Sequence, residues 1–264
     1  MSAVSVALPA TASMTSSRLL RAYWAEARHE ITRTLRTPAF VVPTVALPVL
    51  LYLFFGIVLA SSGHASPDPQ AGLYTLSGFV MFSVIGPGLF GLGIGFAIER
   101  QSGIVTLKRA LPMPPAANLL GKLFSSMALS AIVITMLISM AMLIGHAPLS
   151  APQIAKFMIV SVLGVAPFCA LGLLIGTLVS GTAAPAVVNL LYFPMIYLSG
   201  LFPFPLPKAM QLAARVWPAF HLNQLSLAAL GLKTAIDVRI AAAVLVTFTV
   251  VCLVLAARRL ARVG

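Results

Sequence analysis

The stretch Glu99-Arg-Gln-Ser-Gly-Ile-Val-Thr-Leu-Lys-Arg-Ala-Leu-Pro-Met-Pro-Pro115 is a charged interruption between two apolar segments. Residues 73–98 before it and residues 123–144 after it carry no charged side chain. Each segment is as long as the ~20 apolar residues that cross a bilayer as a helix. We therefore expect the charged stretch to lie where lipid ends and water begins, as a contact surface for a soluble partner.

The composition of the whole chain agrees with this interpretation. Of its 264 residues, 60% are hydrophobic and only 8% are charged, whereas soluble domains carry about 25% charged residues. The length suits one membrane domain of about six helices. The sequence thus predicts an all-α polytopic membrane protein.

The hydropathy pattern divides the chain into a tail and a single membrane domain at 16–264. The tail (1–15) is rich in Ala, Ser and Thr and is expected to be disordered. Three prolines after the fifth span predict a re-entrant hairpin. The expected elements are an amphipathic helix (16–37), spans at 39–60, 73–98, 119–144, 154–179, 183–201 and 238–257, the charged loop (99–118) and the hairpin (202–237).

The basic residues predict the orientation. With six spans, twelve of the 17 Lys and Arg residues fall on the side of both termini and the charged loop, and five fall on the other side. Basic residues accumulate on the cytoplasmic side of membrane proteins. We therefore expect a multi-pass protein of the cell (inner) membrane with both termini in the cytoplasm, and no nucleic-acid partner despite the net charge of +12.

No catalytic, metal or nucleotide motif stands out. The two cysteines lie singly in apolar segments, and no phosphate-binding glycine loop is present. An intramembrane serine protease would need Ser199, next to Gly200, to pair with His221, but Tyr197-Leu198 precedes the serine in place of a Gly-x-Ser-Gly motif. Asn189 is polar but uncharged, so no span carries the ionisable mid-membrane residue of an ion-driven carrier.

The charged loop resembles that of the type-2 ATP-binding-cassette (ABC-2) permeases, membrane subunits that export substrates with a separate ATPase. The residues that carry the resemblance are Glu99, Arg100, Gly103, Thr106, Leu107, Lys108, Arg109 and Pro112, followed by Gly121 and Lys122. Gln101 and Lys108 stand where many members carry glutamate, so this loop is more basic than usual. A second stretch, from Pro194 through Ser199, Gly200 and the prolines after it, resembles the family's fifth span and hairpin.

The resemblance implies a function and partners. Residues 103–110 would form a coupling helix lodged in a cytoplasmic ABC ATPase, with Leu107 as anchor, Lys108 and Arg109 orienting it, and Glu99 paired with Arg100 or with a basic residue of the amphipathic (connecting) helix. This chain would bind no cofactor itself, since ATP and Mg²⁺ would sit on the ATPase. A second permease copy, identical or a paralogue, would complete the pathway within the lipid bilayer.

The spans suggest where the pathway runs. Gly91 and Gly95 form a small-xxx-small pair that favours close helix packing. Together with Asn189, Pro194, Ser199 and Gly200 they are expected to line or pack the pathway. Its uncharged surroundings favour a hydrophobic or amphiphilic cargo, such as a drug or a lipid-like molecule. A non-transporting assembly or scaffold module is the main alternative, and the protease is a less favoured one.

Overall fold

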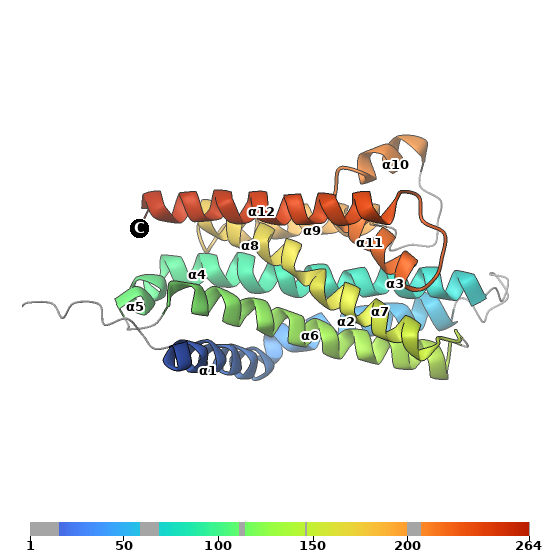
Figure 1. The fold of residues 1–264 in the computed structure, drawn as a ribbon, viewed down its shortest axis with the longest axis horizontal. Coiled ribbons are helices and arrows are strands. Elements are labelled where there is room, and N and C mark those ends of the chain that lie inside the picture. Colours follow the sequence, from blue (N-terminus) through green and yellow to red (C-terminus); the bar gives the residue numbers. More distant parts are fainter. Residues whose placement is uncertain (1–15, 59–68, 111–113, 146, 200–206, 264) are drawn as a thin grey trace, which may run out of the picture.

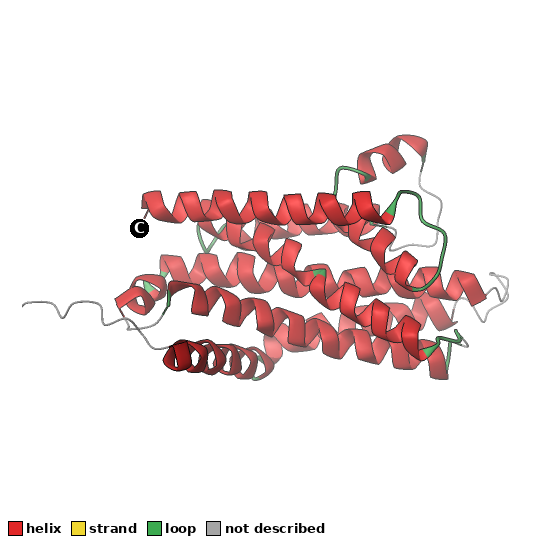
Figure 2. Ribbon diagram, in the orientation of Figure 1, coloured by secondary structure: helices red, strands yellow, loops and turns green. Residues whose placement is uncertain are grey.

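The computed structural model describes residues 16–58, 69–110, 114–145, 147–199 and 207–263, and these form helices with no strand among them (Figure 2). The elements that make up the N-terminal half are α1 (Ser16–Leu35), α2 (Pro38–Leu51), η1 (Tyr52–Val58), α3 (Pro69–Gly86), η3 (Pro87–Ile94), α4 (Gly95–Gln101), α5 (Ile104–Ala110) and α6 (Pro115–Leu143). Those of the C-terminal half are α7 (Ala151–Leu163), α8 (Val165–Leu178), α9 (Ala184–Leu198), α10 (Lys208–Ala214), α11 (Pro218–Ala229) and α12 (Val238–Val263). The expected all-α membrane fold is confirmed.

The long helices run along one axis of the molecule (Figure 1). Helices α1 and α5 and the C-terminus lie at one end, which we call the α5 end, and α10 lies at the opposite end. Five helical segments in the described chain are long and apolar enough to cross a membrane: Pro38–Val58, Gln70–Gln101, Ala116–Leu143, Ala151–Leu178 and Val238–Arg262. The fifth predicted span (183–201) corresponds to the shorter apolar helix α9, which carries the chain back from the α5 end.

The second span, built from α3, η3 and α4, is the most buried of the five. It is apolar on every side, as expected for a helix surrounded by other helices. Its most extensive contacts are those of η3 with α8, and α6 covers another side. The residues of this span therefore set the spacing of the bundle.

Pro87 breaks the regular hydrogen bonding of the second span, and α6 repairs it. Proline has no N–H, so the carbonyl of Ser83, four residues earlier, loses its helical donor. The hydroxyl of Ser130 donates to that carbonyl at 2.9 Å, and the hydroxyl of Ser126, one turn away, donates to the Pro87 carbonyl at 3.0 Å. These two serines explain how a proline-broken helix, π-helical from Pro87 to Ile94, is stable inside the bundle.

Glycines on α8, not the predicted pair on the second span, allow the closest helix approach. A Cβ on Gly172 would lie 2.9 Å from the backbone nitrogen of Gly93, and one on Gly176 would lie 2.9 Å from the Gly93 carbonyl oxygen. A Cβ on Gly95 would meet nothing within 4 Å, and one on Gly91 would meet only the Ser126 hydroxyl. Within the described chain, Gly95 therefore borders open space and Gly91 faces the Ser126 hydroxyl of α6, and the role of this pair in lining or packing the pathway stays a prediction.

The second arm of the predicted hairpin contains helix α11, which is buried among the spans. Helix α11 packs against α3, α7, α9 and α12 and is buried over most of its surface, while α10 is largely exposed. Asn223 of α11 donates to the Ser199 carbonyl and accepts from the Ser77 hydroxyl, both at 2.7 Å. Buried irregular backbone at membrane depth requires such protein partners. Helix α12 continues to Val263, beyond the predicted end at residue 257.

Candidate functional site

Helix α5 is a short helix that projects at the α5 end between the second and third spans (Figure 1). Gly103 separates it from α4 with a φ of +76°, a left-handed conformation that glycine adopts without a steric penalty. Helix α6 begins five residues after α5 ends. The turn at Gly103 therefore folds α5 back beside the helices on either side of it.

Glu99, the last acidic residue of the second span, is buried between two cations. Its Oε1 accepts from Arg33 Nη1 of α1 at 2.7 Å and from Lys122 Nζ of α6 at 2.8 Å. Of the two partners expected for Glu99, the basic residue of the connecting helix is the one observed. Lys122 joins this carboxylate to α6, and Glu30 of α1 lies 3.4 Å from both cations.

Lys108 of α5 forms ion pairs with carboxylates of α1 beside this site. Its Nζ lies 2.9 Å from a carboxylate oxygen of Glu26, 3.4 Å from one of Glu30, and 2.8 Å from the side-chain oxygen of Asn118. The Lys108 ammonium thus points back to α1 and α6, and it is not directed outward as an orienting charge for a partner. Gly121 leaves room for this arrangement, because a Cβ there would crowd the Glu26 and Glu30 side chains at 3.2 and 3.3 Å.

Together these side chains form one neutral ion-pair cluster that joins α1, α4, α5 and α6. Its members are Glu26, Glu30, Arg33, Glu99, Lys108 and Lys122. They include three of the five acidic residues in the chain. Because buried charges are stable only when paired, movement of one of the four helices would strain its ion pairs with the helices that it contacts.

The outer members of the cluster stay charged over a wide pH range. Burial opposes the charged form of Lys108, but the hydrogen bond to Glu26 and the nearby carboxylates raise the pKa of Lys108 above its ordinary value. The hydrogen bond to Glu99 likewise raises the pKa of Arg33. The Lys108 ammonium that links α5 to α1 is therefore charged at neutral pH.

Among the side chains of α5 that the structure describes, the exposed ones are uncharged. Leu107 is 67% exposed, and Ile104 and Thr106 beside it are exposed as well. An exposed leucine on a short helix that is anchored by ion pairs offers apolar surface for burial in a pocket on another protein. Arg109 lies on α5, but its side chain falls outside the described part of the structure, and Pro112 lies outside the described residues.

Arg100 and Gln101 connect the second span to the turn between α8 and α9. Arg100 Nη2 donates to the Val179 carbonyl at 2.7 Å, and Gln101 Oε1 accepts from the backbone N–H of Gly181 at 2.6 Å. Arg100 therefore binds a carbonyl at the end of α8 and does not pair with Glu99. A cation at a helix C-terminus also complements the helix dipole.

Comparison with known proteins identifies the family of this chain. A family model described as ABC-2 type transporter matches residues 21–230, from α1 to the end of α11. The chain belongs to the ABC-2 type transporter family. It is also 28% identical over 197 residues to the protein named "Putative transport permease YvfS" of Bacillus subtilis (strain 168). The aligned region covers 74% of this chain and 79% of that protein.

In this ABC-2 chain the predicted residues of the fifth span make local contacts. Asn189 donates to the Pro185 carbonyl of its own helix at 2.8 Å, and Pro194 lies on the exposed side of α9. Ser199 donates to the Ile196 carbonyl at 2.7 Å. Gly200 lies outside the described residues.

These contacts also bear on the protease alternative. The Ser199 hydroxyl is committed to its own helix, and His221 Nε2 bonds to the Arg215 carbonyl at 2.8 Å. Neither side chain is arranged as a nucleophile with its base. The geometry gives this alternative no support.

The ion-pair cluster contains members that the sequence analysis did not assign to the site. Glu26 and Glu30 were not expected there, Lys122 had no stated role, and Asn118, which accepts a hydrogen bond from Lys108, was not expected beside them. Glu26 and Glu30 stand four residues apart and so share one face of α1, which was the available signal. Lys122 stands alone among apolar residues near the start of a span, where an ionisable residue indicates a partner.

Proposed function

We propose that this chain is the permease subunit of an ATP-driven exporter and that it couples to a separate cytoplasmic ATPase through α5. In this proposal the chain binds no nucleotide, and ATP and Mg²⁺ are bound by the ATPase. Membership in the ABC-2 family supports the transport role. The observation that carries the proposal is the pairing of an exposed apolar tip, Leu107, with a buried ion-pair cluster behind it.

The cluster provides a physical route for coupling. When two ATPases close on ATP, a helix held in one of them must move with it. Lys108 would pass that movement to α1, and Glu99 with Lys122 would pass it to the second and third spans. Because paired buried charges separate only at a cost of several kcal/mol, these elements move as one rigid body.

The orientation follows from the basic residues. The α5 end carries the arginines of α1 and the C-terminal end of α12, and the positive-inside rule supports a cytoplasmic position for this end. Leu20 and Trp24 are exposed on α1, which suits a helix lying in the headgroup layer. The pathway would form between this chain and a second permease copy, identical or paralogous.

The cargo is proposed to be hydrophobic or amphiphilic. The described residues of the second and fifth spans, 69–98 and 184–199, contain no charged side chain. Helix α9 exposes Leu190 and Phe193. A pathway with such walls provides no charge to replace the hydration of an ionic cargo.

The proposal is tested by co-expressing the chain with its ATPase and replacing Leu107 with aspartate. Leu107→Asp is expected to abolish co-purification of the ATPase and ATP-dependent transport in proteoliposomes, because a carboxylate would be buried in an apolar pocket. Val216→Asp is the matched control, since Val216 is 82% exposed beside α10 at the opposite end. Equal transport by the two variants would contradict the proposal.

A further inference from the structure

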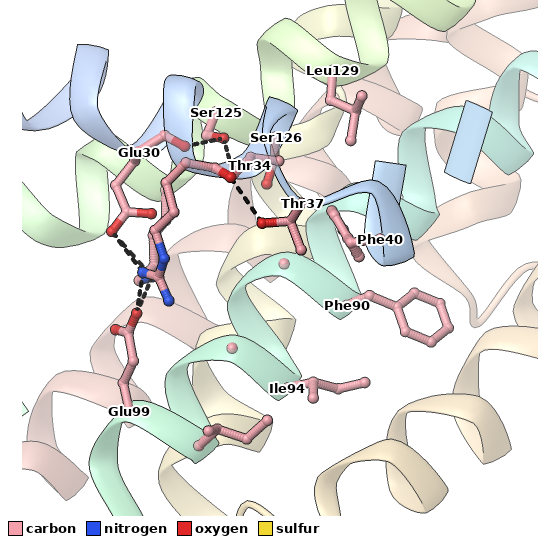
Figure 3. Close-up of a pocket in the computed structure, with 15 residues that line it drawn as sticks. Glu30, Thr34, Thr37, Phe40, Phe90, Ile94, Glu99, Ser125, Ser126 and Leu129 are labelled. Carbon is pink, nitrogen blue, oxygen red and sulfur yellow. Dashed lines mark hydrogen bonds and ion pairs between the residues drawn. The ribbon is translucent and has the colours of Figure 1, made fainter. Parts of the chain in front are cut away.

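A cavity of about 310 Å³ is lined on one side by the junction of α1 and α2 (Figure 3). Helix α1 and the start of α2 form one wall, η3 and α4 form a second, and α6 forms a third. The volume is at the lower limit of typical small-molecule sites. The cavity borders the ion-pair cluster, but transport as proposed above does not require it to be filled.

The cavity is polar at one end and apolar at the other. Arg33, Glu99 and Lys122 line it near the α5 end, whereas Phe90 and Leu129 line it farther along the same helices. At 1.5 Å per residue, the nine residues from Phe90 to Glu99 span about 13 Å. A change from charged to apolar lining over that distance, along the axis of the spans, matches the orientation of a lipid whose headgroup faces the α5 end.

Part of one wall of the cavity is formed by two glycines. Gly91 and Gly95 both line it; a Cβ on Gly95 would meet nothing within 4 Å, and one on Gly91 would lie 3.1 Å from the Ser126 hydroxyl. Ile94 and Phe90 flank this open strip (Figure 3). A smooth apolar strip between larger side chains accommodates an extended hydrocarbon chain.

Arg33 has hydrogen-bond donors left over at the polar end. Both of its ion pairs use Nη1, and within the described part of the chain Nη2 and Nε have no acceptor. The side chain is 50% exposed, so this edge of the guanidinium is accessible. Two parallel N–H groups of arginine match the oxygens of a phosphate, and Arg36, one turn on and exposed, adds positive charge.

We propose that this cavity binds a phospholipid of the leaflet at the α5 end. The phosphate would bind the free edge of Arg33, and the start of one acyl chain would lie along Gly91 and Gly95. The bound lipid would thereby tie α1 to the second span beside the cluster. This site concerns a resident lipid, and it stands whether or not the chain exports an amphiphile.

The test is a titration of the full chain, purified in a non-ionic detergent, with three probes. They are dioctanoyl phosphatidylglycerol, dioctanoylglycerol with the same chains but no phosphate, and inorganic phosphate with no chains. Binding is measured by native mass spectrometry and by the shift in melting temperature. The phosphatidylglycerol is expected to bind saturably and to raise the melting temperature, and neither of the other two probes is expected to do so.

Two variants locate the site. Gly95→Phe fills the strip and is expected to weaken phosphatidylglycerol binding at least tenfold, a loss of about 1.4 kcal/mol. Ala243→Phe on the exposed side of α12 is the control for added apolar surface. Arg33→Lys keeps the charge, loses the two-pronged geometry, and is also expected to bind about tenfold more weakly.

Three outcomes would overturn the proposal. Equal binding of dioctanoylglycerol would show an apolar crevice with no headgroup recognition. Equal stabilisation by inorganic phosphate would show an oxyanion site with no lipid. Unchanged phosphatidylglycerol binding by both Gly95→Phe and Arg33→Lys would place the lipid elsewhere.

Discussion

Replacing Lys122 with methionine tests the ion-pair cluster most sharply. Lys122 Nζ lies 2.8 Å from Glu99 and 3.4 Å from Glu30, and all three side chains are buried. Methionine fills a similar volume but leaves two buried carboxylates with one cation fewer. Removing one member of a buried ion pair costs about 3–5 kcal/mol, and for a chain of this size that lowers the melting temperature by roughly 10 °C.

The assay is thermal unfolding of the purified chain in detergent, with two companion variants. The double variant Lys122→Met, Glu99→Gln removes both charges. Its loss in free energy of unfolding is expected to be about 2 kcal/mol smaller than the sum of the losses in the two single variants, a coupling typical of contacting residues. Lys156→Met, at an exposed lysine on α7, is the control and should change the melting temperature little. Strictly additive effects of Lys122→Met and Glu99→Gln would refute the buried pairing.

Three further predictions concern stability. Gly172→Ala is expected to lower the melting temperature strongly, because the added Cβ would lie 2.9 Å from the backbone of the second span. Gly95→Ala should be tolerated, and equal effects of the two changes on the melting temperature would contradict the assignment of the packing glycines. Ser130→Ala leaves the Ser83 carbonyl, freed by Pro87, without a donor and should lower the free energy of unfolding by about 1–3 kcal/mol. Ser139 is exposed and bonds within its own helix, so Ser139→Ala should lower it far less in the same denaturation assay. The raised pKa of Lys108 makes its contribution to stability complete below the ordinary lysine pKa of 10.5, and the contribution is lost only as the pH rises through the higher folded-state value. The melting temperatures of the native chain and Lys108→Met should therefore differ by a constant amount from pH 7 to 9 and converge only above pH 10.5. Convergence near neutral pH would show that the ion pair is not formed.

The positions of the spans could be predicted because they depend on local composition. Uncharged segments of about 20 residues cross the membrane wherever they occur, and the short helix at 104–110 follows from a charged segment bounded by Gly103 and prolines. The partners of Glu99 were harder to identify. Arg33 is 66 positions away, and only the packing of α1 on α6 brings it into contact.

The direction of Lys108 and the packing glycines could not be read from the sequence. A seven-residue helix is too short for its pattern to show which face is buried, so a lysine that points inward looks like one that points to a partner. Several glycine pairs have the spacing that permits close helix contact, and the choice between Gly91–Gly95 and Gly172–Gly176 depends on how the spans are rotated. That rotation is set by long-range packing, including the serine contacts of α6 with the proline-broken second span.

The central claim is that the tip of α5 binds the ATPase on the cytoplasmic side. It is tested most directly by placing a photo-activated cross-linking amino acid at position 107 in cells that express both proteins. The account predicts a covalent adduct between this chain and the ATPase from position 107 and none from position 216. An adduct from position 216 with none from position 107 would contradict it.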